Sequence, residues 1–236
     1  SSNGTLYAVM NLDEGTDYQN YTDRSLVEIL SHIKALATVI NKYHSDGYLH
    51  LDIKPENVFV IPETAEHVFV FDFDSVCKIE DLRNKKIVNL SYSEGFSAPE
   101  QVQGNITKIG PRTDIYAIGA LLFFKLFNRK PTFDECRYSA SFDYKEMSFY
   151  DERLRPAFYR CLNEILHRTL ATSTLLRWNS MEQVIGALEE LTKLSDVEDA
   201  YLINTFTYNS AFFVGRSDEI EEIHEKIQDN NVLFLS

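Results

Sequence analysis

Apolar residues recur every three or four positions between Leu26 and Ile40, and this spacing predicts a long amphipathic helix that ends near His44. Gly47 follows just beyond that end, where glycine commonly terminates a helix. Other apolar-rich segments predict three further helices, at residues 113–128, 156–172 and 181–194. The chain is therefore expected to be mainly helical.

β-Branched and aromatic residues mark three short strand candidates, at residues 6–10, 58–61 and 67–71. The polar residues 62–66 predict a turn, so the second and third candidates should form a β-hairpin. Asn57 enters the first strand of this hairpin and Asp72 leaves the second. Because antiparallel pairing brings these two ends together, Asn57 and Asp72 are expected to face each other.

Composition narrows the class of protein. Hydrophobic residues make up 44% of the 236 residues, which is enough for a packed core. The formal net charge of −13 argues against nucleic acid and anionic membrane as partners, because both repel an acidic surface. The longest apolar run, residues 115–124, is too short to span a bilayer, and no signal peptide is visible in a chain that begins with Ser1. Cys77, Cys136 and Cys161 lack metal-binding spacing and are typical of thiols in a reducing compartment, so a cytoplasmic location is expected.

Chemistry-bearing residues gather in the loop before the hairpin. Asn57 and Asp72 offer oxygen ligands that suit Mg²⁺, which keeps coordination positions for phosphate oxygens. Asp52 would accept or orient the proton of an attacking hydroxyl, and Lys54 would offset charge on a transferring phosphoryl group. A solvated polar loop is the plainer explanation of such residues, but the hairpin and the downstream motifs argue against it. The constellation therefore indicates phosphoryl transfer.

Residues 50–57 resemble the catalytic loop of eukaryotic-type protein kinases, and residues 72–74 resemble their metal-binding triplet with its glycine replaced. The resemblance covers about residues 5–194 and implies an α+β fold: the mainly α-helical large lobe, or C-lobe, with small β-hairpins. It also implies ATP and Mg²⁺ as cofactors, held by Lys54, Asn57 and Asp72, and a protein substrate. Lys54 after Asp52 favours serine or threonine as the acceptor.

Further motifs extend the resemblance. Residues 95–100 resemble the end of a kinase activation segment, in which Glu100 is the structural acid. Arg177 matches the arginine that pairs with this acid, and Asp114 matches the acid that binds backbone amides near the catalytic loop. Ser93 occupies the place of a substrate-facing threonine.

The chain also departs from the family pattern. Leu51 replaces the usual arginine and cannot pair with a phosphorylated activation segment, so activity without such phosphorylation is expected. Asp74 replaces a glycine and should incur a backbone cost. Trp178 stands where proline is usual. Since the resemblance begins at the hinge, the small lobe, or N-lobe, is expected to be largely absent, and this chain alone is not expected to bind ATP tightly or to phosphorylate a substrate.

The last part of the chain has a different character. Residues 195–211 are read as a linker after a kinase-like domain of residues 1–194. Residues 212–236 resemble the start of a STAND or AAA-type P-loop ATPase module, with Val214-Gly215-Arg216 before a helix and a final strand. Such a module would be an intramolecular partner, and a Gly-x-x-x-x-Gly-Lys-Ser/Thr loop is expected after it. An ordinary terminal helix and strand is the alternative.

Three functions stay open from the sequence. The first is an active serine/threonine kinase, which the joint presence of Asp52, Lys54, Asn57 and Asp72 favours. The second is a pseudokinase that binds without turnover, which Asp74 favours. The third is a regulatory segment of a larger signalling ATPase.

Overall fold

The computed structural model describes residues 15–61, 68–84, 90, 92–137 and 142–195. The predicted strand at 6–10, the turn at 62–66, nearly all of the predicted linker and the ATPase-like segment 212–236 lie outside the described residues.

Six α-helices are described: α1 Leu26–Ser45, α2 Ile79–Arg83, α3 Pro99–Val102, α4 Pro111–Phe127, α5 Pro156–Leu170 and α6 Met181–Leu194. Four single 3₁₀ turns are described as well: η1 Pro55–Asn57, η2 Ile106–Lys108, η3 Tyr144–Glu146 and η4 Thr174–Leu176. The described strands are β1 Thr16–Asp17, β2 Tyr48–Leu49, β3 Val58–Val60, β4 Val68–Val70 and β5 Cys77–Lys78.

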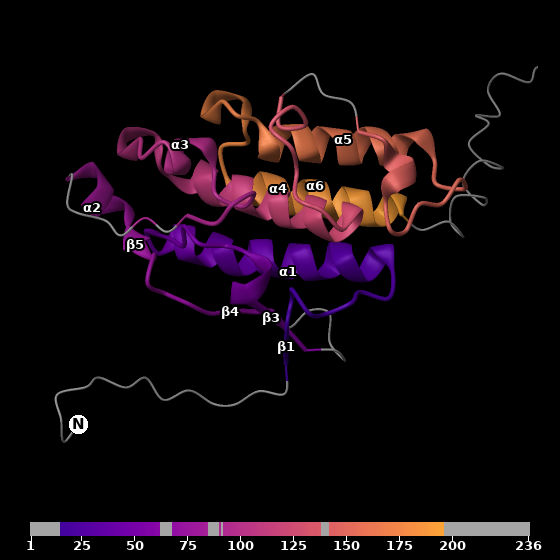
Figure 1. The fold of residues 1–236 in the computed structure, drawn as a ribbon, viewed down its shortest axis with the longest axis horizontal. Helices are drawn as coiled ribbons and strands as arrows, with labels where there is room; N and C mark the ends of the chain where they lie inside the picture. Colours follow the sequence, from indigo (N-terminus) through magenta and orange to yellow (C-terminus); the bar gives the residue numbers. More distant parts are fainter. Residues whose placement is uncertain (1–14, 62–67, 85–89, 91, 138–141, 196–236) are drawn as a thin grey trace, which may run out of the picture. The chain divides into compact units, whose positions relative to one another are not determined.

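The helices form stacked layers (Figure 1). Helix α1 packs against α4 and α6 on one side and against strand β4 on the other. Helix α5 packs on α4 and α6. The Ser25 side chain caps α1 by accepting the backbone N–H of Glu28 at 3.1 Å. The buried stripe predicted from the three- and four-residue spacing faces this core.

Helix α4 lies at the centre and is buried on all sides from Thr113 to Phe123. At Gly119 it meets α5 so closely that a Cβ atom would overlap the side chain of Thr169. The two helices can therefore approach only because residue 119 has no side chain.

The predicted hairpin is present as an antiparallel pair of β3 and β4, and β1 adds a third strand beside β3. Val58 pairs with Val70 and Phe59 with Phe69. The valines of both strands are buried, whereas Phe69 is 39% exposed on the outward face. The alternation is that of a sheet with one face in the core.

The predicted helices agree with the structure to within about two residues at either end. Helix α4 begins earlier than expected, at Pro111, because proline fits the first turn of a helix. The polar stretch 73–97 contains β5 and α2, which its composition did not predict. No helix among the described residues is long and apolar enough to cross a membrane.

Candidate active site

The loop of residues 50–57, called the catalytic loop below because of its resemblance, is fixed by Asp114 at the start of α4. Its carboxylate accepts the backbone N–H of His50 at 3.0 Å and of Leu51 at 2.9 Å, and His44 Nε2 lies at 2.8 Å. Burial would raise the pKa of Asp114, but the bonds from His44 and from the His50 backbone hold it below its ordinary value. Leu51 has a φ of 63°, and Gln101 Nε2 donates to its carbonyl at 2.6 Å. These contacts hold a backbone conformation that leucine rarely adopts.

Asp52 lies at the centre of the loop and is buried. Its Oδ2 accepts Lys54 Nζ at 2.8 Å and Asn57 Nδ2 at 3.0 Å. The Ser93 hydroxyl donates to its Oδ1 at 2.8 Å. A serine hydroxyl on this carboxylate has the geometry that a general base needs toward the proton it receives.

The hairpin brings Asn57 and Asp72 to one end of the sheet, as expected. The backbone N–H of Phe71 donates to the carbonyl of Asn57 at 2.9 Å, directly beside the Val58–Val70 pair. Because the Asn57 amide nitrogen donates to Asp52, its Oδ1 stays available as an acceptor. Asp72 is exposed, with a φ of 63°.

One amide and one carboxylate fit Mg²⁺, which binds few protein ligands and completes its shell with water and phosphate oxygens. Within the described ranges, no three His, Cys, Asp or Glu side chains gather to hold a metal by themselves. The pair would therefore leave most coordination positions of a Mg²⁺ ion to water or phosphate oxygens.

The expected backbone cost at Asp74 is wrong. Positive φ angles fall on Asp72 and Leu51 in this region, not on Asp74. The backbone N–H of Asp74 instead donates to Asp72 Oδ1 at 3.3 Å. The aspartate at position 74 therefore takes an ordinary conformation, without the strain that a glycine would relieve.

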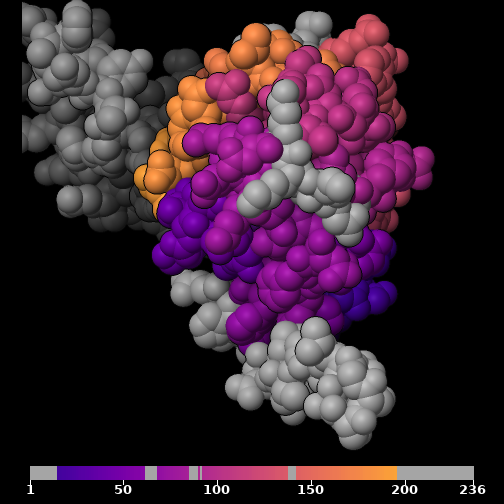
Figure 2. All heavy atoms as spheres, turned by 90° about the vertical axis from the view of Figure 1, so that its left-hand side faces the viewer, coloured from indigo at the N-terminus to yellow at the C-terminus, as the bar shows by residue number. Residues whose placement is uncertain are grey.

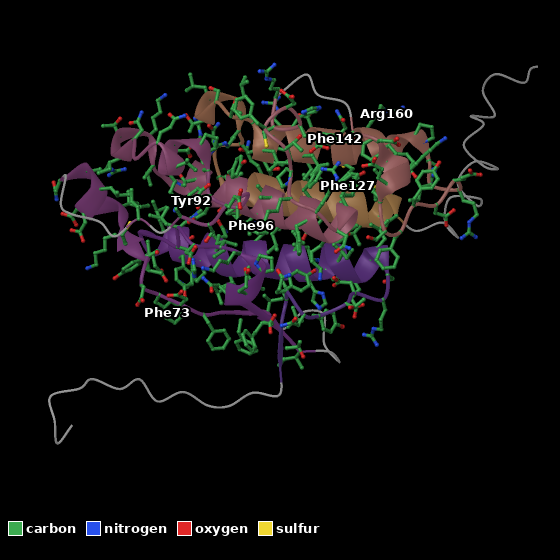
Figure 3. The ribbon with its side chains drawn as sticks, in the orientation of Figure 1. Phe73, Tyr92, Phe96, Phe127, Phe142 and Arg160 are labelled. Carbon is green, nitrogen blue, oxygen red and sulfur yellow. The ribbon has the colours of Figure 1, made fainter. Side chains whose placement is uncertain are left out.

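The buried His50 side chain stabilises the loop from the core side. It is fully buried, and its Nδ1 accepts the backbone N–H of Asp52 at 3.3 Å. Burial lowers the pKa of His50, so the ring is held neutral. The Phe73 ring lies 6.4 Å from the His50 ring and is labelled in Figure 3.

Glu100 and Arg177 form a buried two-pronged ion pair, with distances of 2.7 and 2.9 Å. Thr113 Oγ1 also donates to Glu100, and the carbonyls of Ala171 and Arg112 accept from Arg177. The pair links the end of the activation segment at α3 to η4, and atoms of these two regions lie beside each other in Figure 2. Sequence resemblance indicated this pair across 77 positions.

Leu51 lies in a small apolar cluster with Leu49, Leu82 and Ile109. Leu90 of the activation segment and Cys77 pack against this cluster. Burial raises the pKa of Cys77 to about 11, with Asp114 and Asp81 adding to the effect, so its thiol stays protonated.

A cleft of about 430 Å³ opens beside Asp52. Its lining residues are Lys54, Glu56, Asn57, Ser93, Glu94, Phe96 and Lys130. Two contributors to the site had no signal in the sequence: His44 and Gln101 act over long sequence separations, and their residue types alone indicate no partner.

The protein kinase domain family matches residues 1–188 of this chain. The striated muscle preferentially expressed protein kinase of Danio rerio is 24% identical over 211 residues, covering 88% of this chain and 7% of that protein. The smooth muscle myosin light chain kinase of Gallus gallus is 27% identical over 104 residues, 44% of this chain and 5% of that protein. The chain therefore spans a small fraction of these relatives' lengths.

The solved structure of the twitchin kinase region from C. elegans aligns with a TM-score of 0.52 at 22% identity, over 72% of this chain and 29% of that one. This likeness shows a shared kinase fold.

Proposed function

This chain belongs to the protein kinase family, and we propose that it is part of an active kinase that transfers the γ-phosphoryl group of ATP to serine or threonine hydroxyls of a protein. The observation that carries this proposal is the contact of 2.8 Å between the Ser93 hydroxyl and Asp52. The Ser93 hydroxyl marks a position beside the Asp52 carboxylate that the hydroxyl of an acceptor residue can occupy instead. Lys54 beside Asp52 supports the preference for serine and threonine.

The side chains divide the chemistry between them. Asp52 orients the acceptor hydroxyl and takes its proton as the oxygen attacks phosphorus. Lys54, bound to the same carboxylate at 2.8 Å, offsets negative charge at the transferring group. Asn57 and Asp72 would hold Mg²⁺, which neutralises phosphate charge when it is bound.

The outward face of the sheet offers a place for the adenine base. The rings of Phe59 and Phe71 lie 4.7 Å apart on this face, next to Asn57. Aromatic faces bind planar bases by stacking and by excluding water. This location would direct the phosphates toward the Asn57–Asp72 end.

The apolar cluster around Leu51 supports activity that is independent of phosphorylation. Leu90 packs against this cluster, so hydrophobic burial holds the activation segment where other kinases use a charged contact. Phosphatase treatment of the full-length gene product should leave its rate unchanged, and a large drop would contradict this part of the proposal.

Mutation of the two acids tests the main proposal. In the full-length gene product, Asp52→Asn should lower phosphate incorporation by on the order of 10²–10⁴. Asp72→Asn should abolish the Mg²⁺-dependent binding or turnover. Asp134→Asn, an exposed aspartate paired with Arg137, is the matched control and should have the wild-type rate. Full activity of Asp52→Asn would refute the assignment.

The second candidate is a pseudokinase or regulatory module of a STAND-type signalling ATPase, and the sequence of residues 212–236 favours it. Here the kinase-like part would bind or sense without turnover. The assay above separates the two, because a pseudokinase gives no incorporation above the Asp52→Asn level. Reading roughly the next 15 codons of the gene tests the ATPase itself, which requires Gly-x-x-x-x-Gly-Lys-Ser/Thr there.

A further inference from the structure

A second cavity, of about 310 Å³, lies between the segment after β1 and the C-terminal end of α4. Its apolar walls come from Ile29, Phe124, Phe149 and the ring of Tyr21. Thr22, Asn128 and Ser148 add polar groups. Apolar walls with a few polar groups are typical of small binding pockets.

Asp23 and Lys125 also line this cavity, and they neutralise each other. Lys125 Nζ lies 2.9 Å from Asp23 Oδ2 and donates to the carbonyls of Tyr18 and Tyr21 at 3.2 and 2.8 Å. An ammonium group has three donors, so these three oxygens satisfy it.

The second carboxylate oxygen of Asp23 also has hydrogen-bonding partners. Its Oδ1 lies 2.8 Å from His32 Nδ1 and accepts the Tyr18 hydroxyl at 3.2 Å. The Asp23 and Lys125 side chains are 2% and 9% exposed. Breaking a pair this deeply buried is costly, so this wall is rigid and offers no unpaired charge to an occupant.

One aromatic contact joins the wall of this cavity to the wall of the cleft at the candidate active site. The Phe124 ring, which lines the cavity, meets the edge of the Phe96 ring with centroids 5.7 Å apart. Phe96 lines the cleft that also contains Lys54, Asn57 and Ser93. Figure 3 shows Phe96 beside α4, the helix that carries Phe124. An extended peptide that leaves the acceptor position along Phe96 therefore comes next to Phe124.

We propose that this second cavity is a remote substrate subsite that binds an aromatic side chain of the protein substrate. The inference rests on the proposed kinase function. The neutralised Asp23–Lys125 pair disfavours a charged occupant, and the rings of Phe124 and Phe149 favour an aromatic one through edge and stacking contacts. The volume is sufficient for one ring with its linking atoms.

Kinetics with the full-length gene product test the subsite. A set of peptides shares one serine acceptor and carries a single phenylalanine that is moved one position at a time. At one position the KM should fall about tenfold against the all-alanine peptide, the effect of burying part of an aromatic ring, with kcat unchanged. Absence of a favoured position would overturn the proposal.

A cavity-filling variant locates the effect. Ser148 is exposed at the rim, so Ser148→Trp should fill the space, remove the gain from phenylalanine and leave the KM of the all-alanine peptide unchanged. Thr22→Trp is the second variant if Ser148→Trp does not fold. Lys193→Trp, on a 75% exposed residue of α6, is the control and should keep the gain. A gain that persists in both filled variants would overturn the proposal.

Direct binding separates this proposal from the kinase function. The best peptide, made with 4-fluorophenylalanine, is titrated into the 236-residue chain and followed by ¹⁹F NMR. Binding that Ser148→Trp abolishes supports the subsite even if no phosphate is transferred. Self-association of the chain that Ser148→Trp abolishes, without peptide binding, would assign the cavity to a second copy and overturn the proposal.

Discussion

Replacing Arg177 by methionine would leave the buried carboxylate of Glu100 without its cation. Both side chains are essentially inaccessible, at 0% and 2% exposure. Among the described residues, Thr113 Oγ1 at 2.9 Å would still donate to the carboxylate. Breaking one side of a buried ion pair costs about 3–5 kcal/mol of unfolding free energy. Glu100→Gln should cost a similar amount, because it leaves the guanidinium of Arg177 buried without its counter-ion.

The double variant should cost much less than the sum of the two single variants. Independent losses would add to roughly 6–10 kcal/mol, whereas removal of both charges leaves neither one unpaired, so a total of no more than about 5 kcal/mol is expected. Urea unfolding of the wild type, both single variants and the double variant measures this coupling. Strict additivity would refute the reasoning, because it would mean that the two charges do not interact.

An exposed pair provides the control for this cycle. Arg168 Nε lies 2.9 Å from Glu164 Oε1 one helical turn away, and the two side chains are 38% and 54% exposed. Water already solvates both groups, so the same substitutions there should change the unfolding free energy by only about 0.3–0.5 kcal/mol. The two pairs have similar N···O distances but differ in exposure. A larger loss of unfolding free energy at Arg177 than at Arg168 would therefore be due to burial.

Two further predictions concern packing and pH. Gly119→Ala should destabilise the chain by about 1–3 kcal/mol because its methyl group would overlap Thr169. Gly186→Ala, which has open space around it in α6, should stabilise the chain by about 0.5–1 kcal/mol. Thermal unfolding of both variants measures the difference, and equal shifts of the unfolding temperature would contradict it. His50 has a folded pKa below its ordinary value of 6.5, so the unfolded state takes up the proton first as the pH drops. The unfolding free energy should therefore fall below about pH 6.5, by at most about 1.4 kcal/mol per pH unit. If the urea midpoints of wild type and His50→Gln change in parallel from about pH 7.5 to 5, this contribution is excluded.

The sequence predicted the parts of the fold that depend on local patterns. The buried stripe of α1 repeats every three or four residues, and the valines of the hairpin alternate with outward residues, so each pattern indicates its element directly. Strand β5 and helix α2 left no such signal. They are short, and β5 exists because Cys77 and Lys78 pair with β2, a contact between segments nearly thirty residues apart. A partner that distant cannot be read from composition.

The candidate site was likewise predicted only in part from the sequence. The resemblance of motifs identified Asp52, Asn57, Asp72 and the Glu100–Arg177 pair, because these residue types and spacings are specific. It gave no indication of His44, which contacts Asp114 across 70 positions. The resemblance also suggested strain at position 74, whereas the positive φ falls on Asp72. Backbone strain is decided by the hydrogen bonds around a residue, and those depend on the assembled loop.

Helix α4 connects these separate loops through contacts at both of its ends. Near its start, Asp114 holds the catalytic loop and Thr113 binds the acid that closes the activation segment. Near its end, Lys125 binds the carbonyls of Tyr18 and Tyr21 in the segment after β1. Because the helix between them is buried on all sides, it cannot rotate or slide without opening the core. The geometry of the proposed site therefore depends on the same packing that stabilises the fold. A substitution in the middle of α4, between Asp114 and Lys125, should disturb the active site only to the extent that it destabilises the whole domain.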